Sequence, residues 1–89
     1  MNLENVLEML RSGTGLRTHS GKVRPGDVFV ALSGTHVDGA RFIDDAVARG
    51  ASVVVHAEGV AATPRSGVSY LAVDNPALVL GSLARAACG

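Results

Sequence analysis

The fold is decided by residues 23–39, VRPGDVFVALSGTHVDG, which combine a turn, a strand and a glycine-punctuated loop. Pro25-Gly26 predicts a tight turn, because proline fixes φ and glycine accepts the positive φ of a type II turn. Val28–Leu32 is apolar at every position, which predicts a strand buried on both faces of a sheet. The loop over residues 33–39 exposes backbone N–H groups beside the start of a helix, and such a place suits an anion.

Helical and strand patterns alternate on either side of this stretch. Apolar residues at helical spacing predict an amphipathic helix that begins near Leu3 and ends before Ser12. Gly15–Ser20 is compatible with a short strand or with an extended loop. A second helix follows Asp38, which is placed to cap it, and Gly50 is placed to end it in a left-handed conformation.

The second half of the chain repeats the alternation. Strands are expected over residues 51–56 and 68–73, and Asn75-Pro76 predicts the cap and first position of a last helix. The order strand, helix, strand implies a parallel crossover. We therefore expect an α/β fold, a small mixed or mostly parallel sheet with helices packed on it. The second helix should turn one apolar side to that sheet, made of Ala40, Phe42, Ile43, Ala46 and Val47.

The length and composition limit the classes of protein to which the chain can belong. The chain has 89 residues, which allows one domain, residues 1–89, with a single modest core. Eight basic and eight acidic residues balance, so no electrostatic footprint of a nucleic-acid binder is present. A single cysteine, Cys88, excludes an intramolecular disulfide, and no apolar run approaches the roughly 20 residues that cross a bilayer. We expect a cytoplasmic domain that does not associate with membranes.

Few residues suggest chemistry on local grounds. No spacing of histidine, cysteine or acid indicates a metal site, and no glycine-rich loop with a lysine indicates nucleotide hydrolysis. His36 is either a donor to a phosphate or uracil carbonyl or a solvated loop residue, and Thr35 is open in the same way. Ser20 is either a ligand hydroxyl or a turn former, and His19 and His56 are expected to be structural or exposed. Ser20, His36 and Asp38 can be written as a hydrolase triad, but nothing like a nucleophile elbow surrounds the serine, so no catalytic residue is expected.

An ordered set of short motifs resembles a known family. Residues 23–55 carry Pro-Gly-Asp, Val-Phe-Val-Ala, Asp-Gly, an apolar helix and Gly-Ala in sequence, and these resemble the N-terminal domain of the Mur ligases. The MurE type, which adds the third amino acid to UDP-N-acetylmuramoyl-dipeptide, is the most similar, and the MurF type is the nearest alternative. The resemblance runs from about Gly15 to the final helix. It implies a module that binds the UDP moiety of a UDP-N-acetylmuramoyl-peptide and is not catalytic by itself.

The resemblance also implies where the ligand would bind. In the family a separate central domain binds ATP and Mg, so this domain itself is expected to hold no cofactor. We also expect it to be a monomer. The serine of the family's Asp-Ser-Arg motif matches Ser20, and the loop that touches uridine matches residues 35–37. The UDP-binding residues implied are Thr18, Ser20, Thr35, His36 and Val37.

Two positions depart from the family pattern. His19 and Gly21 stand where the family has aspartate and arginine on either side of the serine. This departure motivates an alternative, a self-standing Mur-like domain without nucleotide affinity that acts as a protein-binding module. A UDP complex would count against the alternative.

Overall fold

The computed structural model describes residues 2–32, 36–58 and 67–88, and it describes the side chains of all of these except residues 36–41. The elements follow one another in this order: α1 (Leu3–Arg11), β1 (Leu16–Arg17), the short 3₁₀ helix η1 (Ser20–Lys22), β2 (Val28–Val30), α2 (His36–Ala48), β3 (Val53–Ala57), β4 (Ser69–Val73) and α3 (Pro76–Cys88).

The strands form one parallel sheet. Their spatial order, β1-β2-β3-β4, is the order in which they occur along the chain. Val28 pairs with Val53, and Val53 pairs with Ser69, so the register is continuous across the three longest strands. The predicted α/β class is confirmed, as is the parallel crossover from β2 through α2 to β3. Gly15–Ser20, for which strand and loop were both open, contains the two-residue edge strand β1.

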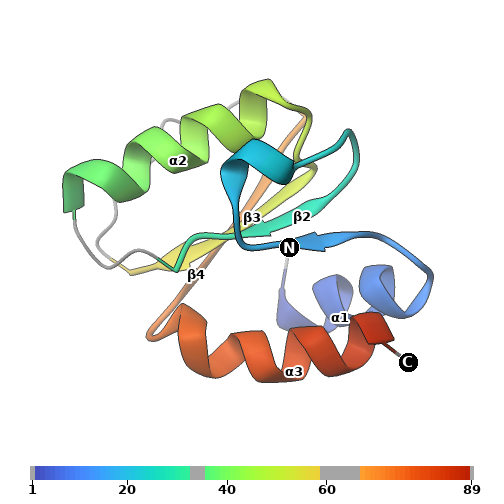
Figure 1. Cartoon of the computed structure of the whole chain (residues 1–89). Helices are drawn as coiled ribbons and strands as arrows, with labels where there is room; N and C mark the ends of the chain where they lie inside the picture. Colours follow the sequence, from blue (N-terminus) through green and yellow to red (C-terminus); the bar gives the residue numbers. More distant parts are fainter. Residues whose placement is uncertain (1, 33–35, 59–66, 89) are drawn as a thin grey trace.

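Helices cover both faces of the sheet (Figure 1), with α2 on one side and α1 and α3 together on the other. Each face therefore has its own hydrophobic core, because successive strand residues point in opposite directions. The core under α1 and α3 consists of Val6, Leu10, Val28, Val30, Val53, Val55 and Leu83. The core under α2 consists of Val23, Phe29, Ala31, Ile43, Ala46, Ala51 and Val54. Within the described residues, no helix is both long enough and apolar enough to cross a bilayer.

The predicted turn before β2 is present. Asp27 N–H donates to the carbonyl of Arg24 at 3.0 Å, and Gly26 has a φ of 91°, as a type II turn requires. Gly50, which ends α2 with a φ of 104°, packs against this turn. A Cβ on Gly50 would lie 2.7 Å from the Cα of Pro25, so the end of α2 and the turn can meet only because residue 50 is glycine.

Asp27 joins the turn to the edge strand. One carboxylate oxygen, Oδ2, accepts a hydrogen bond from the Arg24 backbone N–H at 2.9 Å and another from Arg17 Nε at 3.1 Å. Asp27 is buried and Arg17 is partly exposed. A single carboxylate thus hydrogen-bonds both to the turn and to Arg17 of β1. Residues 18–20 follow β1 directly, so the same carboxylate helps to position them.

The ends of β2 and α2 differ from the sequence prediction. The strand expected over Val28–Leu32 ends at Val30, because the chain leaves the sheet after Ala31, and Leu32 is 40% exposed. The helix expected after Asp38 begins at His36, so Asp38 is the third residue of the helix and not its cap. Phe42, expected in the core, is 44% exposed because the buried face of α2 is centred on Ile43 and Ala46.

The last helix begins as the sequence predicts. Asn75 Oδ1 accepts a hydrogen bond from the Ala77 N–H at 3.0 Å, and Pro76 occupies the first helical position. The sequence also predicts a loop over residues 59–67, and all of this segment except Gly67 lies outside the described residues.

Candidate functional site

A small cavity lies where β1 and β2 end. It has a volume of about 190 Å³, and it lies at the carboxyl edge of a parallel sheet, the edge at which α/β proteins hold ligands. This volume is below the roughly 300–1,000 Å³ of pockets that enclose a whole drug-sized ligand, so the cavity suits one end of a larger molecule. Its lining residues are Thr18, His19, Ser20, Phe29, Leu32 and Phe42.

Three segments supply these residues. Thr18, His19 and Ser20 follow β1 directly, and Phe29 belongs to the middle of β2, where it is almost fully buried. Leu32 follows β2, and Phe42 projects from α2. Leu32 and Phe42 are two of only three large apolar side chains that are exposed in the described part of the chain. The segment after β1 therefore gives the cavity two hydroxyl-bearing residues, Thr18 and Ser20, whereas β2 and α2 give it apolar walls.

Ser20 is fixed between the sheet and α2. It is only 7% exposed, it begins η1, and its carbonyl accepts a hydrogen bond from Val23 N–H at 3.2 Å. Its hydroxyl lies close enough to Asp45 of α2 to have the largest effect on that carboxyl, whose pKa it lowers. Arg49, with Nε 3.2 Å from Asp45 Oδ1, lowers the same pKa further. Ser20 is thus both a turn former and a residue of the cavity.

Two of the five expected ligand residues meet in this cavity. Thr18 and Ser20 line it together. His36 and Val37 form the first turn of α2, and their side chains lie outside the described part of the structure. Thr35 lies outside the described residues altogether. Because α2 starts at His36, the unpaired backbone N–H groups of its first turn follow the carboxyl end of β2.

The other two histidines have different surroundings. His19 was expected to be structural or exposed, and it is exposed, but it also lines the cavity. His56 is buried in β3, as a structural histidine, with Nδ1 3.0 Å from the carbonyl oxygen of Ala57. Its ring stands edge-on to Tyr70, with 6.3 Å between the centroids. His56 is therefore part of the sheet and not of the cavity.

A pair of acids lies at the same edge of the sheet, beyond β3 and β4. Glu58 and Asp74 follow the ends of these strands, and Glu58 N–H donates to the carbonyl of Val73 at 2.9 Å. A hydrogen bond with Asp74 and repulsion from its charge raise the pKa of Glu58 above its ordinary value. No group of three or more histidine, cysteine or acidic side chains that could hold a metal ion is found among the described residues.

Sequence reasoning missed most of the apolar lining. Phe42 was assigned to the buried side of its helix and Leu32 to a buried strand, and His19 was expected to be structural or exposed. Phe29 does belong to the core, as predicted, and it also lines the cavity. A helix turns by about 100° per residue, so Phe42 lies at the margin of the face that carries Ile43 and Ala46. This marginal position of an aromatic residue was the one signal in the sequence that Phe42 could be partly exposed.

The sequence of the chain is similar to those of known proteins. Residues 13–87 match the family model described as Mur ligase family, catalytic domain. The chain is similar to three proteins named UDP-N-acetylmuramoyl-L-alanyl-D-glutamate–2,6-diaminopimelate ligase. The protein from Bradyrhizobium diazoefficiens is 51% identical over 63 residues, which are 71% of this chain and 12% of the relative. The protein from Rhizobium meliloti is 41% identical over 70 residues, 79% of this chain and 14% of the relative. The protein from Mesorhizobium japonicum is 46% identical over 69 residues, 75% of this chain and 14% of the relative.

Proposed function

Since the chain belongs to the Mur ligase family, we propose that it is a substrate-binding module whose cavity holds the UDP moiety of a UDP-N-acetylmuramoyl-peptide. Its similar relatives are ligases of the MurE type, and their printed names include a UDP-N-acetylmuramoyl substrate. The chain spans 12% to 14% of the length of these relatives. We therefore propose only that this chain binds the UDP moiety. Addition of the amino acid would require a complete ligase.

The observation that carries the proposal is the composition of the cavity at the ends of β1 and β2. A uracil ring is flat, with apolar faces and polar edges. Phe42 and Leu32 offer apolar surfaces for such faces, while Thr18 and Ser20 bring hydroxyl groups for the edges. The small volume matches a single ring, with the rest of the ligand outside.

The start of α2 supplies a place for the diphosphate. The free N–H groups and the positive end of the dipole of a 13-residue helix favour an anion. His36 lies about 9 Å from Phe42 along the helix axis, at 1.5 Å per residue. In this proposal the base enters the cavity, the phosphates lie toward the first turn of α2, and the sugar and peptide extend outward.

The remaining parts of the function follow from the same assignment. ATP and Mg would be held by another domain of a complete ligase, so neither is needed for UDP to bind here. The domain would act as a monomer in the cytoplasm, where nucleotide-linked precursors are made.

Titration of the ¹⁵N-labelled chain with UDP tests the proposal. We expect amide shifts at residues 18–20, at Leu32 and at Phe42, with a Kd on the order of 1 mM, because most contacts to the complete substrate lie elsewhere. Ser20→Ala should weaken binding about fivefold, since one net hydrogen bond is worth about 1 kcal/mol. ADP, which has the same diphosphate and a different base, should leave residues 18–20 unshifted.

Ser82→Ala is the matched control, because Ser82 is an exposed serine of α3 on the opposite face of the sheet. It should bind UDP as the unmodified chain does. Absence of any shift at residues 18–20 at several millimolar UDP would refute the proposal. It would instead favour a Mur-like domain that has lost its nucleotide, in agreement with His19 and Gly21 at the positions of the family's aspartate and arginine.

A further inference from the structure

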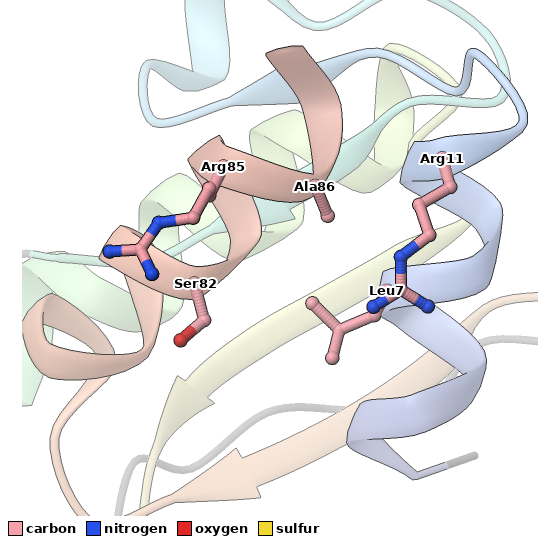
Figure 2. Close-up of a pocket in the computed structure, with 5 residues that line it drawn as sticks. All are labelled: Leu7, Arg11, Ser82, Arg85 and Ala86. Carbon is pink, nitrogen blue, oxygen red and sulfur yellow. The ribbon is translucent and has the colours of Figure 1, made fainter. Parts of the chain in front are cut away.

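A second hollow lies on the face opposite the cavity, in the groove between α1 and α3 (Figure 2). It has a volume of about 580 Å³, three times that of the cavity at the ends of β1 and β2. Leu7 and Arg11 line it from α1, and Ser82, Arg85 and Ala86 line it from α3. We call this hollow the α1–α3 groove.

The charge of the groove is positive and is not neutralised from within the described chain. Arg11 and Arg85 are exposed, and neither forms an ion pair with any described residue. By contrast, Arg17 and Arg49 each have a carboxylate partner, Asp27 and Asp45 respectively. No carboxylate is among the residues that line the groove. Figure 2 shows the two guanidinium groups on the two helices, with Ser82 and Leu7 between them.

The floor of the groove is apolar. Leu7 and Ala86 are half-buried and pack against the core under the two helices. Leu78, which is 77% exposed, precedes Ser82 by four residues and Arg85 by seven, so the three share one face of α3. The apolar surface therefore continues along α3 beyond the groove, where Leu78 is the most exposed large apolar side chain of the described residues.

We propose that the α1–α3 groove is a docking site for an amphipathic helix of a protein partner that carries carboxylates beside an apolar stripe. The apolar floor with Leu78 would receive the stripe, and Arg11 and Arg85 would pair with acids on its margins. Charge complementarity selects this occupant over a nucleic acid, because two guanidinium groups beside exposed leucine do not form the continuous basic surface that a phosphate backbone requires.

The position of the groove makes this docking independent of nucleotide binding. The groove lies between α1 and α3, which cover one face of the sheet, whereas the cavity is lined by Phe29 of the core under α2 and by Phe42 of α2 itself. A helix in the groove would leave the cavity open. The domain could thus hold a ligand and a protein partner at the same time.

Fluorescence anisotropy with a designed peptide tests the proposal. The probe is a labelled helical peptide of about 15 residues with leucine on one face and glutamate beside it, long enough to keep a helix in the groove. The comparison peptide has glutamine at every glutamate. We expect the glutamate peptide to bind the intact chain. Arg11→Gln and Arg85→Gln should each weaken binding about threefold, as exposed ion pairs do, and a rise from about 0.05 M to about 0.5 M salt should weaken it further.

Arg24→Gln is the matched control, because Arg24 is an exposed arginine in the turn before β2, outside the groove. It should bind the peptide as the unmodified chain does. Equal binding of both peptides, or equal effects of Arg24→Gln and Arg85→Gln, would overturn the proposal. Binding to vesicles of anionic phospholipid but not to the peptide would overturn it in favour of a membrane surface, and a dimer lost on Arg85→Gln would overturn it in favour of a second copy. UDP binding by the cavity is measured separately, so either proposal can fail alone.

Discussion

Replacement of Asp27 by alanine should destabilise the domain more than replacement of any other described acidic residue, because Asp27 is the one that is buried. The buried Asp27 Oδ2 accepts two hydrogen bonds, from the Arg24 N–H at 2.9 Å and from Arg17 Nε at 3.1 Å. A hydrogen bond to a charged group contributes about 1.5–3 kcal/mol, and a partly exposed ion pair adds about 0.2–1 kcal/mol. The expected loss is therefore about 2–4 kcal/mol, out of roughly 4–13 kcal/mol for a domain of this length.

Urea unfolding followed by circular dichroism measures this loss. With an m-value of about 1–2 kcal/mol per M, the midpoint of Asp27→Ala should fall by roughly 2 M. Asp27→Asn keeps an oxygen acceptor without the charge and should lose only about 1 kcal/mol. Because Asp27 holds β1, the alanine variant should also weaken UDP binding at residues 18–20. Asp44→Ala, at an exposed acid of α2, is the control. A free energy of unfolding for Asp27→Ala within about 0.5 kcal/mol of the unmodified chain would refute the reasoning.

Three further outcomes follow from the structure. Gly50→Ala should cost about 2 kcal/mol or more in urea unfolding, because alanine is strained at a φ of 104° and its Cβ would overlap Pro25. Asp74→Asn should raise the Tm at pH 7, because it removes the negative charge that repels the Glu58 carboxylate, and should have less effect at a pH low enough to protonate Glu58. Phe42→Ala should reduce UDP affinity several-fold while costing only about 1 kcal/mol of stability, because the ring is already half exposed.

The raised pKa of Glu58 makes the stability of the folded domain depend on pH. An acid whose pKa is higher in the folded state than in the unfolded state binds more protons when folded, so stability falls as pH rises from the ordinary value of 4.5 through the raised one. Asp74→Asn removes the cause and should flatten that part of the profile. An unchanged dependence of stability on pH in Asp74→Asn would contradict this explanation. Full stability of Gly50→Ala, or full UDP affinity of Phe42→Ala, would contradict the other two predictions.

The architecture of this domain could be predicted from sequence because its signals are local. Spacing of apolar residues identified the three longer helices, and Pro25, Gly26 and Gly50 specified backbone conformations that few other residues adopt. The ends of β2 and α2 were less accurate. Strand length depends on where the hydrogen-bonded ladder stops, and a continuous apolar run such as Val28–Leu32 carries no mark of that point.

The candidate site was only partly predictable. Thr18 and Ser20 were implied by a resemblance to a family, and the structure brings them into one cavity. The walls formed by Leu32 and Phe42 were missed, because a pattern of apolar residues does not distinguish a side chain that fills the core from one that borders a cavity. The role of Asp27 was missed because its partner Arg17 lies ten residues away in sequence, on β1, whereas Asp27 lies in the turn before β2.

Intermolecular nuclear Overhauser effects show whether the base of UDP enters the cavity between Phe42 and Leu32. With UDP bound to the ¹³C,¹⁵N-labelled chain, we expect contacts from the uracil ring protons to the Phe42 ring and to the Leu32 methyl groups. Contacts from uracil to residues of the α1–α3 groove instead, or to no residue while UDP still binds, would contradict this placement of the base.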